Sequence, residues 1–205
     1  MAAKASLVFP MLLVFPLFAL VRFRSGRALW QAVAVTAFMA LLVLLQYLYV
    51  FETGSEQTIY KAAGFVGEAN SHVRIDLFHV WSHYSHDVPL SIAASCVFPL
   101  VALVAYGRRL IDYDLVRYAL ALMAVSIAIF AIFTETGVRE FHGNFIWQAM
   151  VANYLLFLTV LIRVWTLWSY RREPVRSVAV AGAFTAHVLA GFAFLVYYFA
   201  NGTYF

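Results

Sequence analysis

Charged side chains and cysteine are both scarce in this sequence. Only 12% of its 205 residues are Asp, Glu, Lys or Arg, whereas 64% are hydrophobic and 18% are aromatic. A water-soluble domain of this length could not bury so much apolar surface, which excludes an ordinary soluble fold. The single cysteine, Cys96, excludes a disulfide framework and a cysteine-based metal site.

The common catalytic signatures are missing too. There is no nucleophile elbow, Gly-rich phosphate loop, His-Glu-x-x-His box or Cys-x-x-Cys-His haem attachment. Covalent nucleophilic catalysis therefore has no candidate residues, and whether the chain is an enzyme stays open.

Long uncharged runs are what the sequence does contain. A helix of about 20 apolar residues crosses a bilayer. Six segments come close to that length: Ala5–Val21, Ala28–Phe51, Val88–Tyr106, Leu115–Thr134, Phe145–Ile162 and Val178–Tyr198. The first contains two prolines and is followed by arginines instead of a cleavage site, so we expect a kinked span and not a signal peptide. The sequence predicts an all-α polytopic membrane bundle of about six transmembrane helices, in a single domain over residues 1–205.

The basic residues predict how this bundle is oriented. Six spans place ten of the fourteen Lys and Arg residues on one side, which the positive-inside rule makes cytoplasmic, with both termini outside. The ten are Arg22, Arg24, Arg27, Arg108, Arg109, Arg117, Arg163, Arg171, Arg172 and Arg176. The net charge of +4 is then a topology signal, and no nucleic-acid partner is expected. We expect a bacterial or archaeal plasma membrane, with lipid, other membrane subunits or further copies of the chain as partners.

Histidines gather on the predicted outer side. Four of the six lie in the segment His72–Asp87. At about 100° per residue, a helix over this segment places five side chains in an arc of about 80°: His72, Asp76, His79, His83 and His86. We therefore predict an external amphipathic helix over 72–87, capped by Asn70 or Ser71, continuous with the third span and kinked by Pro89.

A second cluster is predicted at the same membrane level. Glu135 ends the fourth span, with Gly137 two residues on to stop the helix, and His142 precedes the fifth span. Imidazoles suit copper, zinc and iron, and carboxylates orient them. The predicted metal ligands are His79, His83, His86 and His142, with Asp76, Asp87 and Glu135 around them and copper or haem b as the cofactor.

Polar groups inside the spans form a third set. His187 lies in the sixth span, about 15 Å deeper than the outer cluster, as an axial haem ligand or a hydrogen-bond partner of a residue such as Asn153. Gln148 and Asn153 are expected to bond to neighbouring helices, because unpaired amides are costly there.

Two alternatives to ligation stay open for the outer histidines. Histidines and carboxylates in series also relay protons in membrane proteins. The same residues are equally compatible with an interfacial helix, with Trp81 and Tyr84 in the aromatic belt and the histidines simply hydrated.

Two families share short motifs with the chain. The part from His83 to Phe205 resembles small four-helix bacterial membrane proteins of unassigned function, through "HDVPL", "TETG", "HGNF" and "GFAFLVYYFANGT". This resemblance implies a histidine-bearing four-helix bundle with haem as a candidate cofactor. The order Glu68, His72, Arg74, Asp76, His79 is similar to that in the membrane C subunit of copper-dependent methane and ammonia monooxygenases, which implies copper.

These observations lead to two functional expectations. The first is an integral membrane redox subunit, of an oxidoreductase or monooxygenase, with a metal or haem site facing outside. The alternative is a non-catalytic subunit that serves assembly or the transport of protons or solutes.

Overall fold

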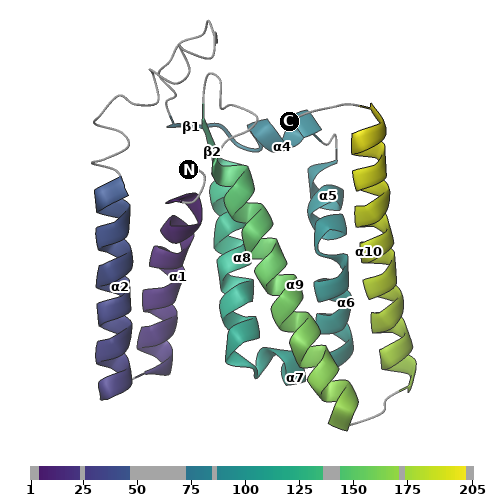
Figure 1. The fold of residues 1–205 in the computed structure, drawn as a ribbon, viewed down its shortest axis with the longest axis horizontal. Helices are drawn as coiled ribbons and strands as arrows, with labels where there is room; N and C mark the ends of the chain where they lie inside the picture. The colour runs from purple at the N-terminus through teal and green to yellow at the C-terminus, as the bar shows by residue number, and fades with distance from the viewer. Residues whose placement is uncertain are drawn as a thin grey trace, which may run out of the picture. The chain divides into compact units, whose positions relative to one another are not determined.

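The computed structural model of the chain is predominantly helical, which confirms the all-α class (Figure 1). It describes residues 5–23, 26–46, 73–84, 87–135, 144–170 and 174–201. The helices are α1 (Ala5–Arg22), α2 (Arg27–Gln46), α4 (His79–Tyr84), α5 (Val88–Ser95), α6 (Val97–Tyr106), α7 (Arg108–Ile111), α8 (Asp114–Ile132), α9 (Asn144–Tyr170) and α10 (Pro174–Asn201). Two short strands, β1 (Val73–Ile75) and β2 (Phe133–Glu135), complete the described part.

Several of these helices have the length and composition of membrane spans. Within the described residues, four qualify: α2, α8, α9 and α10. The consecutive helices α5 and α6 would make a fifth span together, bent by 69°. In α1 the apolar segment Pro10–Arg22 is shorter than a full span. The helices therefore fit an integral membrane protein, whereas a sixth span and the side of each terminus stay predictions.

The chain divides into two compact units. The first comprises Met1–Tyr84 and Ala121–Ala152, and the second comprises Ser85–Leu120 and Asn153–Phe205. Helices α8 and α9 are each divided between the two units. This division does not test whether the chain is a single membrane domain, which stays a prediction from the sequence.

In the first unit, α1 and α2 pack side by side (Figure 1). Val14 and Ala19 of α1 are buried, as is Ala32 of α2. Most of the larger apolar side chains of α2, such as Trp30 and Phe38, are instead exposed. Side chains of this kind on a helix of membrane-spanning length are suited to lipid.

The prediction of one helix over 72–87 is wrong, because Val73–Ile75 is a strand. β1 pairs antiparallel with β2, with Val73 opposite Glu135 and Ile75 opposite Phe133. Val73 and Ile75 are β-branched and favour this extended backbone. Phe78 then adopts a positive φ of 58°, and its N–H donates to the Ala131 carbonyl at 2.7 Å. The left-handed residue turns the chain, so α4 begins only at His79.

The predicted start and kink of the third span also need correction. The described side chain before α5 is Asp87, whose Oδ1 accepts a hydrogen bond from the Leu90 N–H at 3.0 Å, as an N-cap does. Pro89 therefore lies in the first turn of a new helix, where its missing N–H costs nothing, instead of kinking a continuous one. The proposed caps Asn70 and Ser71 lie outside the described residues.

The predicted end of the fourth span is shifted as well. Helix α8 ends at Ile132, and Thr134 and Glu135 belong to β2. Glu135 is therefore a strand residue and does not end the helix. Gly137, the expected stop signal, lies outside the described residues. The reason for the early end is the pairing with β1, which takes up the backbone of Phe133–Glu135.

In the second unit, α6 and α10 lie side by side (Figure 1). Three aromatic rings from three helices of this unit pack together. The ring of Phe98 on α6 is 4.8 Å from that of Phe157 on α9 and 5.4 Å from that of Phe184 on α10. Tilted and edge-on ring pairs at such distances are favourable beyond the area they bury.

Candidate functional site

Strand pairing in the first unit joins the two segments that the sequence singled out. β1 belongs to the histidine segment and β2 to the segment around Glu135. Arg74 lies opposite Thr134 in this ladder, and the Asp76 N–H donates to the Ile132 carbonyl at 3.0 Å. The ladder thus places residues that are about 60 positions apart in the sequence, such as Arg74 and Thr134, next to each other.

Val80 holds α4 against the rest of the first unit by apolar packing. Val80 forms a buried cluster with Phe130 of α8 and Ala149 of α9. Trp81 packs against the same cluster, and its ring lies 4.9 Å from that of Phe130. Because Val80 and Trp81 directly follow His79, this apolar contact fixes the position of the histidine.

Three polar side chains meet at the β1–α4 turn: Arg74, Asp76 and His79. The Asp76 Oδ2 atom is 3.1 Å from Arg74 Nη2 and 3.2 Å from His79 Nδ1. Arg74 Nη2 also lies 3.5 Å from His79 Nε2. The three side chains are 31–46% exposed, so water reaches the cluster.

This geometry defines the role of each nitrogen of His79. A guanidinium only donates, so Nε2 of His79 accepts from Arg74 in the neutral ring, and Nδ1–H donates to Asp76. Protonation at Nε2 would add a second donor facing the guanidinium and break that contact. The contact with Asp76 would remain and gain an opposite charge. These contacts make Asp76 and His79 a candidate acid–base pair.

The same geometry does not suit His79 as a metal ligand. An Nδ1–H bond to a carboxylate is the usual support for a histidine that ligates through Nε2. Here, however, the cationic guanidinium of Arg74 occupies the side of the ring that a metal ion would need. Among the described residues, moreover, no three His, Cys, Asp or Glu side chains are grouped to bind a metal ion. The described residues around His79 therefore do not form a three-ligand metal site.

The remaining predicted ligands are only partly described. His83 lies in α4, but its side chain is outside the described part, as is that of Glu135 in β2. His86 and His142 lie wholly outside it. Asp87 caps α5 in the second unit. Ligation of a metal by His79, His83, His86 and His142 therefore stays a prediction, which the contacts of His79 disfavour for that residue.

His187 lies on α10 with an aromatic neighbour. Its ring centroid is 5.1 Å from that of Phe157, next to the Phe98–Phe157–Phe184 cluster. Asn153, which the sequence offered as one possible partner of His187, instead bonds to Cys96 and to the Ser95 carbonyl in the described structure. Whether His187 binds a haem stays a prediction.

The two amides of the fifth span differ. Asn153 confirms the expectation of a bond to a neighbouring helix, since its Nδ2 donates to the Ser95 carbonyl at 3.0 Å. Gln148 contradicts it: the residue is 1% exposed, and neither amide atom has a hydrogen-bond partner within the described structure.

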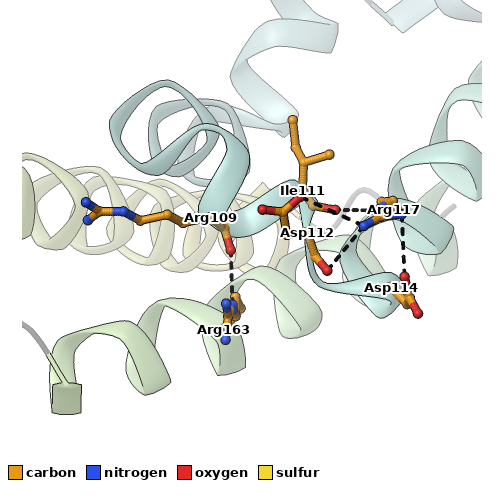
Figure 2. A network of polar contacts seen from close by, with 6 residues as sticks. All are labelled: Arg109, Ile111, Asp112, Asp114, Arg117 and Arg163. Atoms are coloured by element: carbon orange, nitrogen blue, oxygen red, sulfur yellow. Dashed lines mark hydrogen bonds and ion pairs between the residues drawn. The ribbon is translucent and has the colours of Figure 1, made fainter.

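The sequence analysis did not predict a polar network at the turn between α7 and α8 in the second unit (Figure 2). Arg117 donates to the carbonyls of Ile111 and Asp112 and pairs with the carboxylates of Asp112 and Asp114, at 3.9 and 3.6 Å. The close spacing of Asp112, Asp114 and Arg117 was the available signal, since acids beside an arginine at a helix start are a common turn pattern.

A second arginine joins that network from α9. Arg163 Nε donates to the Arg109 carbonyl at 3.2 Å, while the Arg109 side chain extends away from the contact (Figure 2). The Arg163 guanidinium carbon is 5.5 Å from the centre of the Tyr113 ring, within cation–π range. The first contact holds α7 against α9 and the second holds the α7–α8 turn against α9, so both are structural in character.

No protein-family model matches this chain, and no curated protein or solved structure matches it either. The Arg74–Asp76–His79 cluster must therefore be interpreted from its own geometry.

Proposed function

We propose that this chain is a proton-handling subunit of a membrane complex, with Asp76 and His79 as its exchange site. The observation that carries the proposal is the arrangement around His79. One ring nitrogen is 3.2 Å from a carboxylate oxygen, and the other is 3.5 Å from a guanidinium, in side chains that water reaches. This is the environment of an acid–base group, and it supports the transport alternative over ligation by His79.

The proposed membrane arrangement extends the helices that qualify as spans. Six spans, with α1 as the first and the bent α5–α6 pair as the third, put the ten named arginines in the cytoplasm. Both termini and the Arg74–Asp76–His79 cluster then face outside, in the plasma membrane of a bacterium or archaeon. An outer acid–base site in this position would meet protons at the membrane surface.

Proton flux into liposomes tests this function. The purified chain is reconstituted with a pH-sensitive dye inside, and an inward proton gradient is applied with valinomycin and potassium present. Asp76→Asn removes the carboxylate charge at nearly constant volume and should reduce the flux severalfold. Asp112→Asn is the matched control, because it removes an exposed carboxylate from the Arg117 network, and should leave the flux unchanged.

Two results would contradict the proposal. If wild type carries no flux above empty liposomes, or if Asp76→Asn and Asp112→Asn behave alike, the cluster does not conduct protons. Replacement of His79 by Asn should match Asp76→Asn, since both remove the Asp–His pair.

A redox subunit is the second candidate, favoured by the β1–β2 pairing. This pairing brings the backbones of the two histidine-bearing segments together. The ligands would then be His83, His86 and His142, with copper or haem. Metal analysis and a haem absorption spectrum of the purified protein test this candidate. Bound metal or haem that is lost in His83→Ala and kept in His79→Ala supports it, whereas protein purified without either group contradicts it.

A further inference from the structure

The α5–α6 pair is broken at Cys96, between Ser95 and Val97, and the two helix axes differ by 69°. In an unbroken helix the Ser95 carbonyl would accept a hydrogen bond from the N–H four residues on. That residue is Pro99, which has no N–H and whose ring clashes with the same carbonyl. The break is therefore encoded in the local sequence.

A side chain from α9 replaces the missing donor. Asn153 Nδ2 donates to the Ser95 carbonyl at 3.0 Å, and the Cys96 thiol donates to Asn153 Oδ1 at 3.6 Å. Both ends of one amide are thus used at the break. A carbonyl left without a donor in an apolar span would cost more than an ordinary hydrogen bond contributes.

The two halves of this span are anchored very differently. None of the eight residues of α5 is buried. In α6, by contrast, Phe98, Pro99, Ala102 and Tyr106 are buried, and the Tyr106 hydroxyl accepts a hydrogen bond from Trp168 Nε1 at 2.6 Å. Segments with few buried contacts open at the lowest free-energy cost. The helix α6 is thus the fixed half, and α5 is the half that can move.

We infer that the break is a hinge and that the Asn153 amide restrains it, so that α5 moves about Cys96 when the amide bonds are lost. The inference is independent of proton handling, because it concerns residues of the second unit alone. The hinge is a conformational element for the outer half of the third span.

The single cysteine of the chain reports on this hinge. Cys96 is 6% exposed, so N-ethylmaleimide should label wild type slowly in detergent micelles. Asn153→Leu removes both hydrogen bonds at similar volume, and labelling should accelerate roughly tenfold, the effect of about two lost hydrogen bonds on the open population. Thr159→Val is the matched control. Among the described residues the Thr159 hydroxyl bonds to the Leu156 carbonyl in the same helix, so its loss should not change labelling.

Equal labelling rates in folded wild type and Asn153→Leu would overturn the inference. Asn153→Ser provides the same comparison with a smaller change, should the leucine variant not elute as a monodisperse peak. Hydrogen–deuterium exchange tests the hinge in the wild-type protein, without any variant. Amides of α5 should exchange faster than those of α6 in wild type, and equal protection of the two helices would contradict a hinge.

Pro99→Ala supplies a further decisive comparison. It restores the N–H at position 99, so the Ser95 carbonyl regains a backbone donor. The effect of Asn153→Leu on labelling should then become markedly smaller than in the native background. An undiminished effect would show that Asn153 acts on something other than the break.

Discussion

A single arginine closes the turn between α7 and α8. Arg117 contacts two carbonyls and two carboxylates there (Figure 2). The carbonyl bonds matter most, because they occupy backbone acceptors that a turn leaves without helix partners. The ion pairs contribute less, since the Arg117 and Asp112 side chains are 44% and 73% exposed and water screens their charges.

Replacing Arg117 with Ala should lower the free energy of unfolding by roughly 1 kcal/mol, after discounting for that screening. Arg108→Ala is the control, because the Arg108 side chain is exposed and the hydrogen bond described for this residue involves its backbone carbonyl, which the substitution keeps. Thermal unfolding in detergent, followed by tryptophan fluorescence, measures both. Equal midpoints for the two variants would show that the contacts of Arg117 do not stabilise the turn.

At the scale of elements, one glycine joins α6 to α7. Gly107 has φ 49° and ψ −122°, a backbone conformation in which a β-carbon is strained. Space is not the constraint, because an added Cβ would meet only the Leu103 carbonyl oxygen, at 4.0 Å. The need for glycine is therefore conformational.

Gly107→Ala should destabilise the protein by roughly 1–3 kcal/mol, the usual cost of such a backbone conformation for a residue with a side chain. Gly182→Ala should do the opposite and stabilise by roughly 0.5–1 kcal/mol, since Gly182 lies inside α10 with nothing near the added methyl group. Thermal unfolding of both variants checks the signs. Two shifts in the same direction would contradict this reading of the Gly107 conformation.

At the scale of the whole molecule, the number of spans sets the side on which each segment lies. By length and composition the described helices give four candidate spans, or five with the bent α5–α6 pair. If α1 also crosses the membrane, the N-terminus lies on the same side as the C-terminus. If it does not, the N-terminus lies in the cytoplasm under the positive-inside rule.

Compartment-specific reporters should therefore report opposite sides after Glu56 and after Arg172, with Glu56 outside. A reporter at the N-terminus should also report the outside if six spans are present. Agreement of the Glu56 and Arg172 reporters would break the proposed topology. A cytoplasmic N-terminus with the other two as expected would reduce the count to five.

Hydropathy by itself determined where the long helices lie. In the described residues each predicted span falls mainly on helical residues, the third on the two helices α5 and α6, because a run of bilayer length without charge has few other stable conformations. Local chemistry also explains the helix start at Asp87 and Pro89, where the sequence analysis predicted a kink, and the break before Pro99, which it did not predict. These features depend on residues within a few positions of one another.

Only the tertiary structure decided what the polar residues do. Asp76 and His79 were predicted together on a helical face. They do meet, but across a turn created by the pairing of Val73–Ile75 with Phe133–Glu135. In the same way, the Ser95 carbonyl lacks a donor for a local reason, yet its partner Asn153 lies 58 residues away. Short-range periodicity carries no information about such partners, because strand pairing and side-chain bonds between helices depend on how distant segments pack.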